Sequence, residues 1–240
     1  MNDNYKHWTT ELLTLFGMWL WEEEEYGHAL LCIHGPQWGY KIGQQLKLSW
    51  EDVFNDDWGE FKHELELEDN SEIVRPITGK ALEYLEKAFK MLKERNEGDS
   101  IYLNYRTGKP LTTSTLNREL KKHSDQFLYE LTEKLGYEIK LKPLKSNAFQ
   151  IAWVLKMLDR YRYSKKCMIE MSKFMGHRTL KDTIELIEIE PMEKIIYDFL
   201  GSEMCRTTSD ILQDKEQLSI YVNDAINDSY TEFKKSITHL

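Results

Sequence analysis

Lysine, arginine and histidine are the side chains with which this chain could act on a phosphate group. Eleven lysines and arginines fall between Lys140 and Lys181, where only Asp159 and Glu170 are acidic. Basic side chains contact nucleic-acid phosphates, and the tyrosines interleaved in residues 159–166 (DRYRYSKK) suit stacking on bases. The alternative is that these charges cover ordinary solvated helix faces. The candidate DNA-binding residues are Lys142, Lys145, Arg160, Arg162, Lys165, Lys166, Lys173 and Arg178.

The charge of the chain is distributed very unevenly along the sequence. The net charge is −9, yet the segment from Lys140 to Lys181 carries +9, so the remainder carries −18. Ten acidic residues and one lysine, Lys62, occupy positions 51–72. Because phosphate contact depends chiefly on lysine and arginine, a nucleic-acid contact is expected in the basic segment.

A glycine–histidine pair joins two helical patterns inside the basic segment. Gly176 suits the left-handed conformation that ends a helix, and Thr179 suits the N-cap of the next helix. His177 is therefore expected at a turn between two short helices. The apolar faces of these helices are Met168, Met171, Phe174 and Met175 in the first, and Leu180, Ile184 and Ile187 in the second.

The rest of the sequence predicts a mainly helical (α+β) chain with a small antiparallel sheet. Helical patterns cover residues 8–21, 26–34, 78–93, 112–131 and 148–158, and Gly35-Pro36 is expected to end the second of them. Residues 60–67 alternate as a half-buried strand does, residues 72–77 form the return strand, and residues 159–166 form a loop. We expect one domain over residues 1–200 and an amphipathic C-terminal helix in residues 201–240.

The order and spacing of these patterns resemble the catalytic domain of the tyrosine recombinases, the phage integrase family. There, an apolar helix and a glycine turn precede an Arg-Ile-x-Glu-Leu-x-x-Leu-x-Trp-x-Asp run, matched here by Ile42, Leu46, Leu48, Trp50 and Asp52. The second family motif, His-x-Leu-Arg-His, falls on residues 142–146 (KPLKS), and the third falls on Gly176-His177. The resemblance spans residues 9–200 and implies an integrase-like fold.

The resemblance also implies a catalytic site that has lost most of its chemistry. Family enzymes attack a DNA phosphodiester with a tyrosine, while two arginines grip the phosphate. The tyrosine position, nine residues after His177, holds Leu186, and the arginine positions hold Lys41 and Lys145. The histidine of the second motif is replaced by Lys142. Lysine keeps the charge but lacks the planar fork of arginine, so the family-equivalent site of His177, Lys41 and Lys145 is degenerate.

Three functions from different classes remain open. We expect a DNA-binding protein linked to recombination or integration, which binds double-stranded DNA and acts with an active recombinase. The alternative is a protein-interaction module on a recombinase fold that no longer binds DNA, self-associating through the apolar stripe of the C-terminal helix. The third is an active enzyme with another nucleophile, Tyr197, Tyr221 or Tyr230. A structural role for His177, as a hydrogen-bonding residue of the turn, is equally compatible with its position.

No cofactor or metal ion is expected. Cys32, Cys167 and Cys205 are too scattered for a zinc site or a disulfide framework. No apolar run approaches the roughly 18 to 20 residues that span a bilayer. The first thirteen residues also lack the basic-then-apolar layout of a secretion signal. We therefore expect no membrane contact and a cytoplasmic location.

Overall fold

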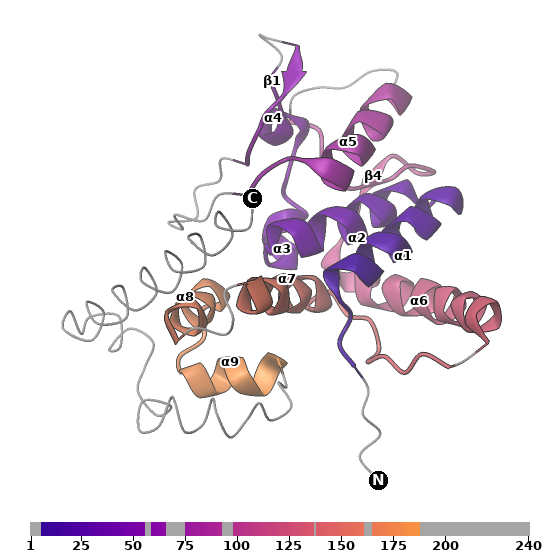
Figure 1. Cartoon of the computed structure of the whole chain (residues 1–240). Coiled ribbons are helices and arrows are strands. Elements are labelled where there is room, and N and C mark those ends of the chain that lie inside the picture. The colour runs from indigo at the N-terminus through magenta and orange to yellow at the C-terminus, as the bar shows by residue number, and fades with distance from the viewer. Residues whose placement is uncertain are drawn as a thin grey trace, which may run out of the picture. The chain divides into compact units, whose positions relative to one another are not determined.

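The structure is a computed structural model of the 240-residue chain, and it describes residues 6–55, 59–65, 75–92, 98–136, 138–160 and 165–187. Its contacts divide the chain into two compact units, Met1–Trp153 and Val154–Leu240 (Figure 1). The predicted domain boundary at residue 200, the C-terminal helix, Cys205 and the alternative tyrosines lie outside the described residues.

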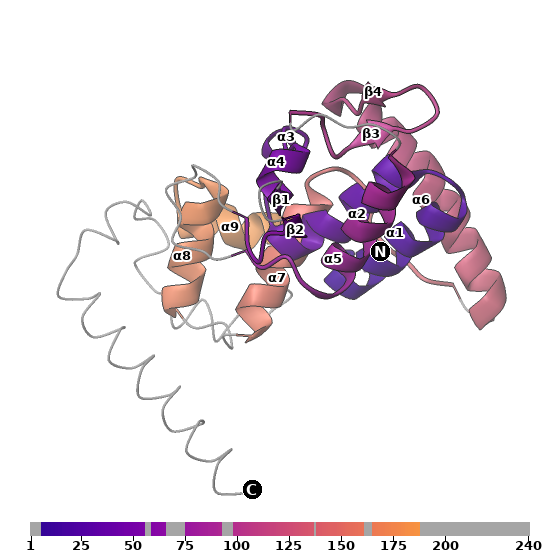
Figure 2. The ribbon, with the colours of Figure 1, turned by 90° about the horizontal axis from the view of Figure 1, so that it is seen from above.

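A buried helix forms the centre of the first unit. α2 (Tyr26–Trp38) has an almost continuously apolar sequence, and its residues 27–36 are all buried. A helix that is apolar on all sides must be covered on all sides. α1 (Thr10–Glu22) and α5 (Gly79–Met91) both pack against α2, and both views of the ribbon show them beside it (Figures 1 and 2).

The predicted end of this helix at Gly35-Pro36 is wrong. α2 continues through Pro36 to Trp38 and ends at Gly39, which is left-handed (φ 69°). Proline removes one helical hydrogen bond and crowds the preceding turn, but Pro36 lies in the last turn, where the burial of Trp38 compensates. Gly35 is required for packing and does not end the helix. A Cβ on Gly35 would lie 2.8 Å from the ring of Phe149.

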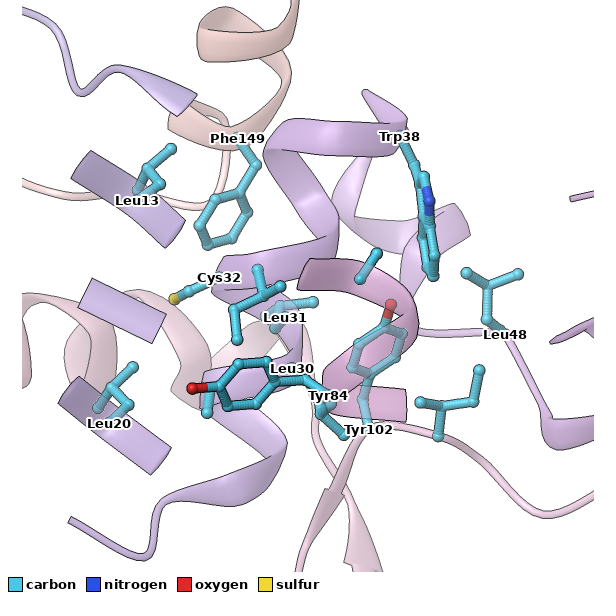
Figure 3. Packing of buried hydrophobic residues seen from close by; sticks show 14 of the residues in the cluster. Leu13, Leu20, Leu30, Leu31, Cys32, Trp38, Leu48, Tyr84, Tyr102 and Phe149 are labelled. Atoms are coloured by element: carbon cyan, nitrogen blue, oxygen red, sulfur yellow. The ribbon is translucent and has the colours of Figure 1, made fainter. Parts of the chain in front are cut away.

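The core draws on segments from both ends of the first unit. Trp153 packs on Gly39 as Phe149 packs on Gly35, so the start of α7 (Ala148–Arg160) lies against the end of α2. Figure 3 shows part of the resulting cluster: Leu13 and Leu20 from α1, Leu30, Leu31, Cys32 and Trp38 from α2, Tyr84 from α5, and Leu48, Tyr102 and Phe149.

Two small antiparallel sheets belong to the first unit. β1 (Phe54–Asn55) pairs with β2 (Glu60–Phe61), and β3 (Leu103–Asn104) pairs with β4 (Lys109–Pro110). The alternation predicted for residues 60–67 fails at His63, which is exposed, but Leu65 is buried. A return segment is present, because the Leu65 N–H donates to the Arg75 carbonyl at 3.0 Å. The acidic turn between these segments lies outside the described residues.

Three further helices complete the first unit. After Gly39 come two short ones, α3 (Ile42–Gln45) and α4 (Trp50–Val53). The long helix α6 (Thr113–Leu135) begins after Thr112 and ends at the left-handed Gly136. α6 packs against α1, which closes the apolar cluster on that side.

The second unit contains the end of α7, then α8 (Lys165–Met175) and α9 (Leu180–Ile187). α8 and α9 pack on each other; of the predicted apolar face of α8, Met168, Met171 and Met175 are buried and Phe174 is half-buried. The predicted loop over residues 159–166 is wrong at both ends. Arg160 is the last residue of α7 and Lys165 is the first of α8. The buried Leu158 explains why α7 extends this far, because it continues the apolar face of the helix.

The predicted fold class, mainly helical (α+β), is confirmed for the described part of the chain, which has two small antiparallel sheets where one was predicted. Within these same segments, no helix has both the length and the apolar character needed to cross a bilayer.

Candidate nucleic-acid interface

The turn that carries His177 is fixed by main-chain hydrogen bonds. Gly176 follows α8 in the left-handed conformation (φ 68°) that the sequence predicted. Its N–H donates to the Lys173 carbonyl at 2.9 Å, and the His177 N–H donates to the Ser172 carbonyl at 3.0 Å. These two bonds form a Schellman motif, which satisfies the last carbonyls of a helix. His177 therefore leaves α8 in a defined direction.

The helix after the turn begins with a reciprocal cap. Thr179 Oγ1 accepts the Asp182 N–H at 3.2 Å, and the Asp182 carboxylate accepts the Thr179 N–H at 2.8 Å. The predicted N-cap role of Thr179 is thus confirmed. Hydrogen bonds from Thr179, first of all from its backbone N–H, lower the pKa of Asp182. This carboxylate occupies the position that a phosphate would take at an open helix N-terminus.

The imidazole ring of His177 is held from inside the second unit. Its Nδ1 lies 2.8 Å from Oγ1 of Thr183, a fully buried residue of α9. The His177 side chain itself is only half-buried. A ring engaged at Nδ1 has Nε2 as its other hydrogen-bonding atom. This arrangement suits a residue that orders the turn, and it also suits one that presents a ring nitrogen to a ligand.

Two exposed cations flank this turn, Lys173 in the last turn of α8 and Arg178 directly after His177. Lys166 and Glu170 share the outer face of α8 with Lys173, because the three are spaced by four and three residues. Cations near the end of α8 also complement its dipole. Around the turn, Lys173 and Arg178 contribute positive charge, and the carboxylates of Glu170 and of the capping Asp182 contribute negative charge.

The other candidates of the second unit differ in what the structure shows of them. Arg160 is exposed at the end of α7. Lys165 begins α8, and Arg162 lies outside the described residues. Lys181 is exposed but forms an ion pair with Glu185 at 3.6 Å. Of the predicted DNA-binding residues before α8, Arg160 is thus the one whose exposure the structure describes in the second unit.

Lys41 is exposed in the first unit and follows a main-chain segment that buried side chains hold in place. It follows Gly39 and the buried Tyr40, and the Arg75 guanidinium lies 4.1 Å from the centroid of the Tyr40 ring. Arg75 is only 2% exposed, and its Nε donates to the Trp38 carbonyl at 3.0 Å. Sequence reasoning missed Arg75, because nothing local marks an arginine as buried. It fixes the segment from which Lys41 projects.

Lys142 is tied to the N-terminal segment. Its N–H donates to the Lys6 carbonyl at 3.0 Å, and Trp8 Nε1 donates to its carbonyl at 2.9 Å. Its Nζ lies 3.3 Å from Nε2 of His7. The half-buried Lys142 therefore holds the N-terminal segment in place. This structural role is separate from the DNA contact that the resemblance implies at this position.

Lys145 is exposed in the turn before α7. The next residue, Ser146, donates its N–H to the Asn117 side-chain oxygen at 2.8 Å. This bond attaches the turn to α6. Lys145 is thus held beside the outer face of α6.

That outer face is basic and was missed by the sequence reasoning. Arg118, Lys121 and Lys122, here called the α6 basic face, are exposed and lie together at spacings of three and four residues. Asp125 follows one turn later, and then Tyr129, which is 67% exposed. The helical spacing of these cations could have indicated the face from the sequence. The stretch was interpreted only as a glycine turn followed by a capped helix.

The candidate residues fall into two groups. Lys41, Lys142, Lys145 and the α6 basic face belong to the first unit, whereas Arg160, Lys166, Lys173, His177 and Arg178 belong to the second. Within the first unit, the packing of Phe149 and Trp153 on Gly35 and Gly39 joins two segments. The segment with Gly35 and Gly39 is followed by Lys41, and the segment with Phe149 and Trp153 is preceded by Lys145.

No cluster of three or more metal-ligating side chains occurs in the described ranges. Cys32 and Cys167 are buried, and burial raises the pKa of both thiols, to about 12 for Cys167. Because the thiolate is the reactive form, both side chains act as apolar core residues at neutral pH.

Comparison with protein-family models, with curated proteins and with solved structures finds no match to this chain. The interpretation of the interface therefore rests on its residues and their geometry.

Proposed function

We propose that this protein binds double-stranded DNA through its basic surfaces, as a degenerate tyrosine-recombinase-like protein with an integrase-like fold. The observation that carries the proposal is the turn at Gly176-His177, built between two helices and flanked by the exposed Lys173 and Arg178. This is the arrangement expected from the family's third motif. Exposed cations beside it are what contact with a phosphate backbone requires.

A second observation supports DNA as the ligand. The α6 basic face (Arg118, Lys121 and Lys122) is exposed in the first unit, and the hydrogen bond from Ser146 to Asn117 holds Lys145 beside it. Together they form a basic cluster on the surface of the first unit. Several neighbouring cations suit a polyanion such as a DNA backbone.

Strand cleavage is not part of this proposal. Leu186 lies in the last turn of α9, at the position where the family carries its nucleophile, and its side chain cannot attack a phosphodiester. Lys41 and Lys145 attract a phosphate as point charges without the two-pronged contact of arginine. The expected activity is binding, together with an active recombinase, and it depends mainly on the DNA backbone rather than on base sequence.

A protein-interaction module is the second candidate, and the surroundings of His177 favour it. Asp182 already occupies the N-terminus of α9, and Thr183 already engages the His177 ring. The turn is therefore complete without an external anion. The −18 charge outside the basic segment also opposes DNA over most of the chain.

The test is binding of the full chain to a duplex of about thirty base pairs across a salt series. Each phosphate contact contributes about 0.9 to the slope of log K against log salt. We expect the double variant Lys173→Gln/Arg178→Gln to lower that slope by about 2. The control Lys90→Gln/Lys134→Gln removes the same charge from exposed positions outside the interface and should leave the slope unchanged.

The outcomes separate the two candidates. Salt-dependent binding that falls in the interface variant and not in the control supports the DNA-binding proposal. Equal losses in both variants would show that only net charge matters. No binding by the unmodified chain at low salt would refute DNA as the ligand and favour a protein partner.

A further inference from the structure

We infer that His28 is a positioning residue for DNA binding, which holds the Glu119 carboxylate away from the α6 basic face so that the cations of that face can contact phosphate groups. This inference rests on the proposed DNA-binding function and adds to it a residue that does not itself touch DNA. Its evidence is a hydrogen bond between two helices of the first unit. His28 Nε2, near the start of α2, lies 3.0 Å from a carboxylate oxygen of Glu119 on α6.

Glu119 is the acidic residue nearest in sequence to the α6 basic face. It directly follows Arg118 and precedes Lys122 by three residues. Glutamate and lysine at this spacing are neighbours on a helix and attract each other. Without another partner, the Glu119 carboxylate is expected to pair with Lys122 and to weaken the attraction of that ammonium group for a phosphate.

The structure gives the Glu119 carboxylate a different partner. Within the described ranges, the contact of Glu119 is with His28 and not with Lys122. The His28 side chain is only 4% exposed, whereas the Glu119 side chain is 33% exposed. The carboxylate therefore turns inward from the edge of the basic face to reach a buried ring.

The direction of the hydrogen bond from His28 to Glu119 is set by its acceptor. An ionised carboxylate has no hydrogen to donate, so the ring nitrogen Nε2 is the donor. Both the neutral and the charged imidazole can carry a hydrogen at Nε2, so the bond does not require a charged ring. On the other side of the ring, Nδ1 lies 3.4 Å from an oxygen of Glu25, which also pairs with Arg106 at 3.3 Å. Contacts on both sides thus hold the ring in place.

A second carboxylate on α6 provides a contrast with Glu119. Asp125 is exposed and lies three residues after Lys122 and four after Lys121, so it shares the face of these lysines. No buried histidine holds it in the described part of the chain. Its negative charge therefore stays on the basic face and opposes a phosphate, whereas that of Glu119 is drawn toward His28.

The first experiment compares these two carboxylates through the affinity of the full chain for duplex DNA at low salt and pH 8. Burial lowers the pKa of His123, the ring beside His28, so His123 is uncharged at this pH. We expect Asp125→Asn to raise the affinity about threefold and Glu119→Gln to change it by less than about 1.5-fold. An equal gain from both substitutions would overturn the inference.

The second experiment moves the donor at position 28. Glutamine can place an amide nitrogen near the position of Nε2, whereas asparagine is one methylene shorter and does not reach Glu119. We expect His28→Asn to lower the slope of log K against log salt by about 1, because the released Glu119 pairs with Lys122 and one phosphate contact is lost. His28→Gln is the matched control and should leave the slope unchanged. Tryptophan fluorescence checks that both variants keep the first unit folded.

The double variant His28→Asn/Glu119→Gln separates positioning from a purely structural role of the ring. Removal of the released carboxylate should restore the slope of the unmodified chain, although the ring is still absent. A slope that stays low would show that His28 acts only by joining α2 to α6, and would overturn the inference. If His28→Asn does not fold, the comparison of Asp125→Asn with Glu119→Gln decides alone, because neither of those side chains is fully buried.

The outcomes also separate this inference from the proposed function. An unchanged slope for His28→Asn would overturn the positioning role while leaving DNA binding intact. Absence of DNA binding by the unmodified chain at low salt would refute the proposed function and the role of His28 together.

Discussion

His34 in the first unit and His177 in the second both meet a hydroxyl group at Nδ1. The distance is 3.1 Å to the Tyr102 hydroxyl in one case and 2.8 Å to the Thr183 hydroxyl in the other. The surroundings differ. His34 is 0% exposed and its ring stacks on Trp38 at 4.4 Å, whereas His177 stands half-buried at a surface turn.

Both ring nitrogens of His34 have hydrogen-bond partners inside the core. Its Nε2 lies 3.3 Å from the Ala81 carbonyl, which only accepts, so Nε2 carries the hydrogen and Nδ1 accepts from Tyr102. Gln45 completes the chain by donating to the Tyr102 oxygen at 3.2 Å. Burial lowers the pKa of His34 to about 3, which keeps the ring neutral.

The comparison teaches that one hydrogen-bonding device can serve two purposes. At His34 the second nitrogen is satisfied by the protein, so the network stabilises the core. At His177 the Nδ1 contact is with a buried hydroxyl, but the ring lies half-buried at a turn that two exposed cations flank. Burial of the ring, and not the residue type, separates the two sites.

The largest expected effect is on stability, and it should be confined to His34. His34→Ala removes a buried ring and leaves the Tyr102 hydroxyl without its acceptor, so we expect a loss of about 3 kcal/mol in the free energy of unfolding. All seven tryptophans lie at or before Trp153, so urea unfolding followed by tryptophan fluorescence reports on the first unit.

His177→Ala is the matched control for this experiment. It removes the same ring from a half-exposed site in the unit without tryptophan, so the fluorescence transition should not move. A shift as large as that of His34→Ala would contradict the division of roles between the two histidines.

The next effect is a pH dependence that belongs to His34. Folded His34 stays neutral down to about pH 3, whereas an unfolded histidine takes up a proton near pH 6.5. Above pH 6.5 neither state binds a proton, and below it the unfolded state binds more. Stability therefore falls as the pH falls from about 6.5 toward 3, and the loss by pH 5 is about 2 kcal/mol.

His34→Gln isolates this contribution from the other titrating groups. Glutamine keeps one donor and one acceptor but does not titrate in this range. Between pH 8 and pH 5, its tryptophan-detected unfolding free energy should fall by about 2 kcal/mol less than that of the unmodified chain. Identical pH dependence in both proteins would mean that His34 is not held neutral by the core.

Sequence reasoning predicted the His177 side of this comparison because its signals are local. Gly176, Thr179 and the apolar spacing of α8 and α9 all lie within about twenty residues. Helix caps and helical periodicity act over one or two turns, so they can be recognised without a fold. The same holds for the mainly helical class of the chain.

The His34 side could not be predicted, since its partners come from distant segments. Tyr102 is 68 residues away and Ala81 is 47 residues away. The packing of Phe149 on Gly35 is also long-range. The sequence around Gly35-Pro36 therefore predicted the end of a helix, although this glycine is where α7 packs against α2. Local patterns show that α2 is buried but not what buries it.

The smallest expected effect concerns the turn that sets His177 apart. Gly176 (φ 68°) and Glu24 (φ 62°) occupy the same left-handed position in two Schellman motifs, because the Glu24 and Glu25 N–H groups bond the carbonyls of Trp21 and Leu20. Gly176→Ala places a side chain where Cβ is disfavoured and should cost about 1 kcal/mol. Amide protons in the last turn of α8 should then exchange about fivefold faster.

Glu24→Gly is the reverse experiment in the first unit. Relief of the left-handed strain should raise the tryptophan-detected unfolding free energy by up to about 1 kcal/mol, less whatever the freer unfolded chain costs. If Gly176→Ala leaves α8 exchange unchanged, the left-handed residue does not limit the stability of the turn. If exchange becomes faster as expected, the turn that carries His177 depends on Gly176, whereas His34 lies inside the continuous helix α2. That result would place the difference between the two histidines in the turn as well as in burial.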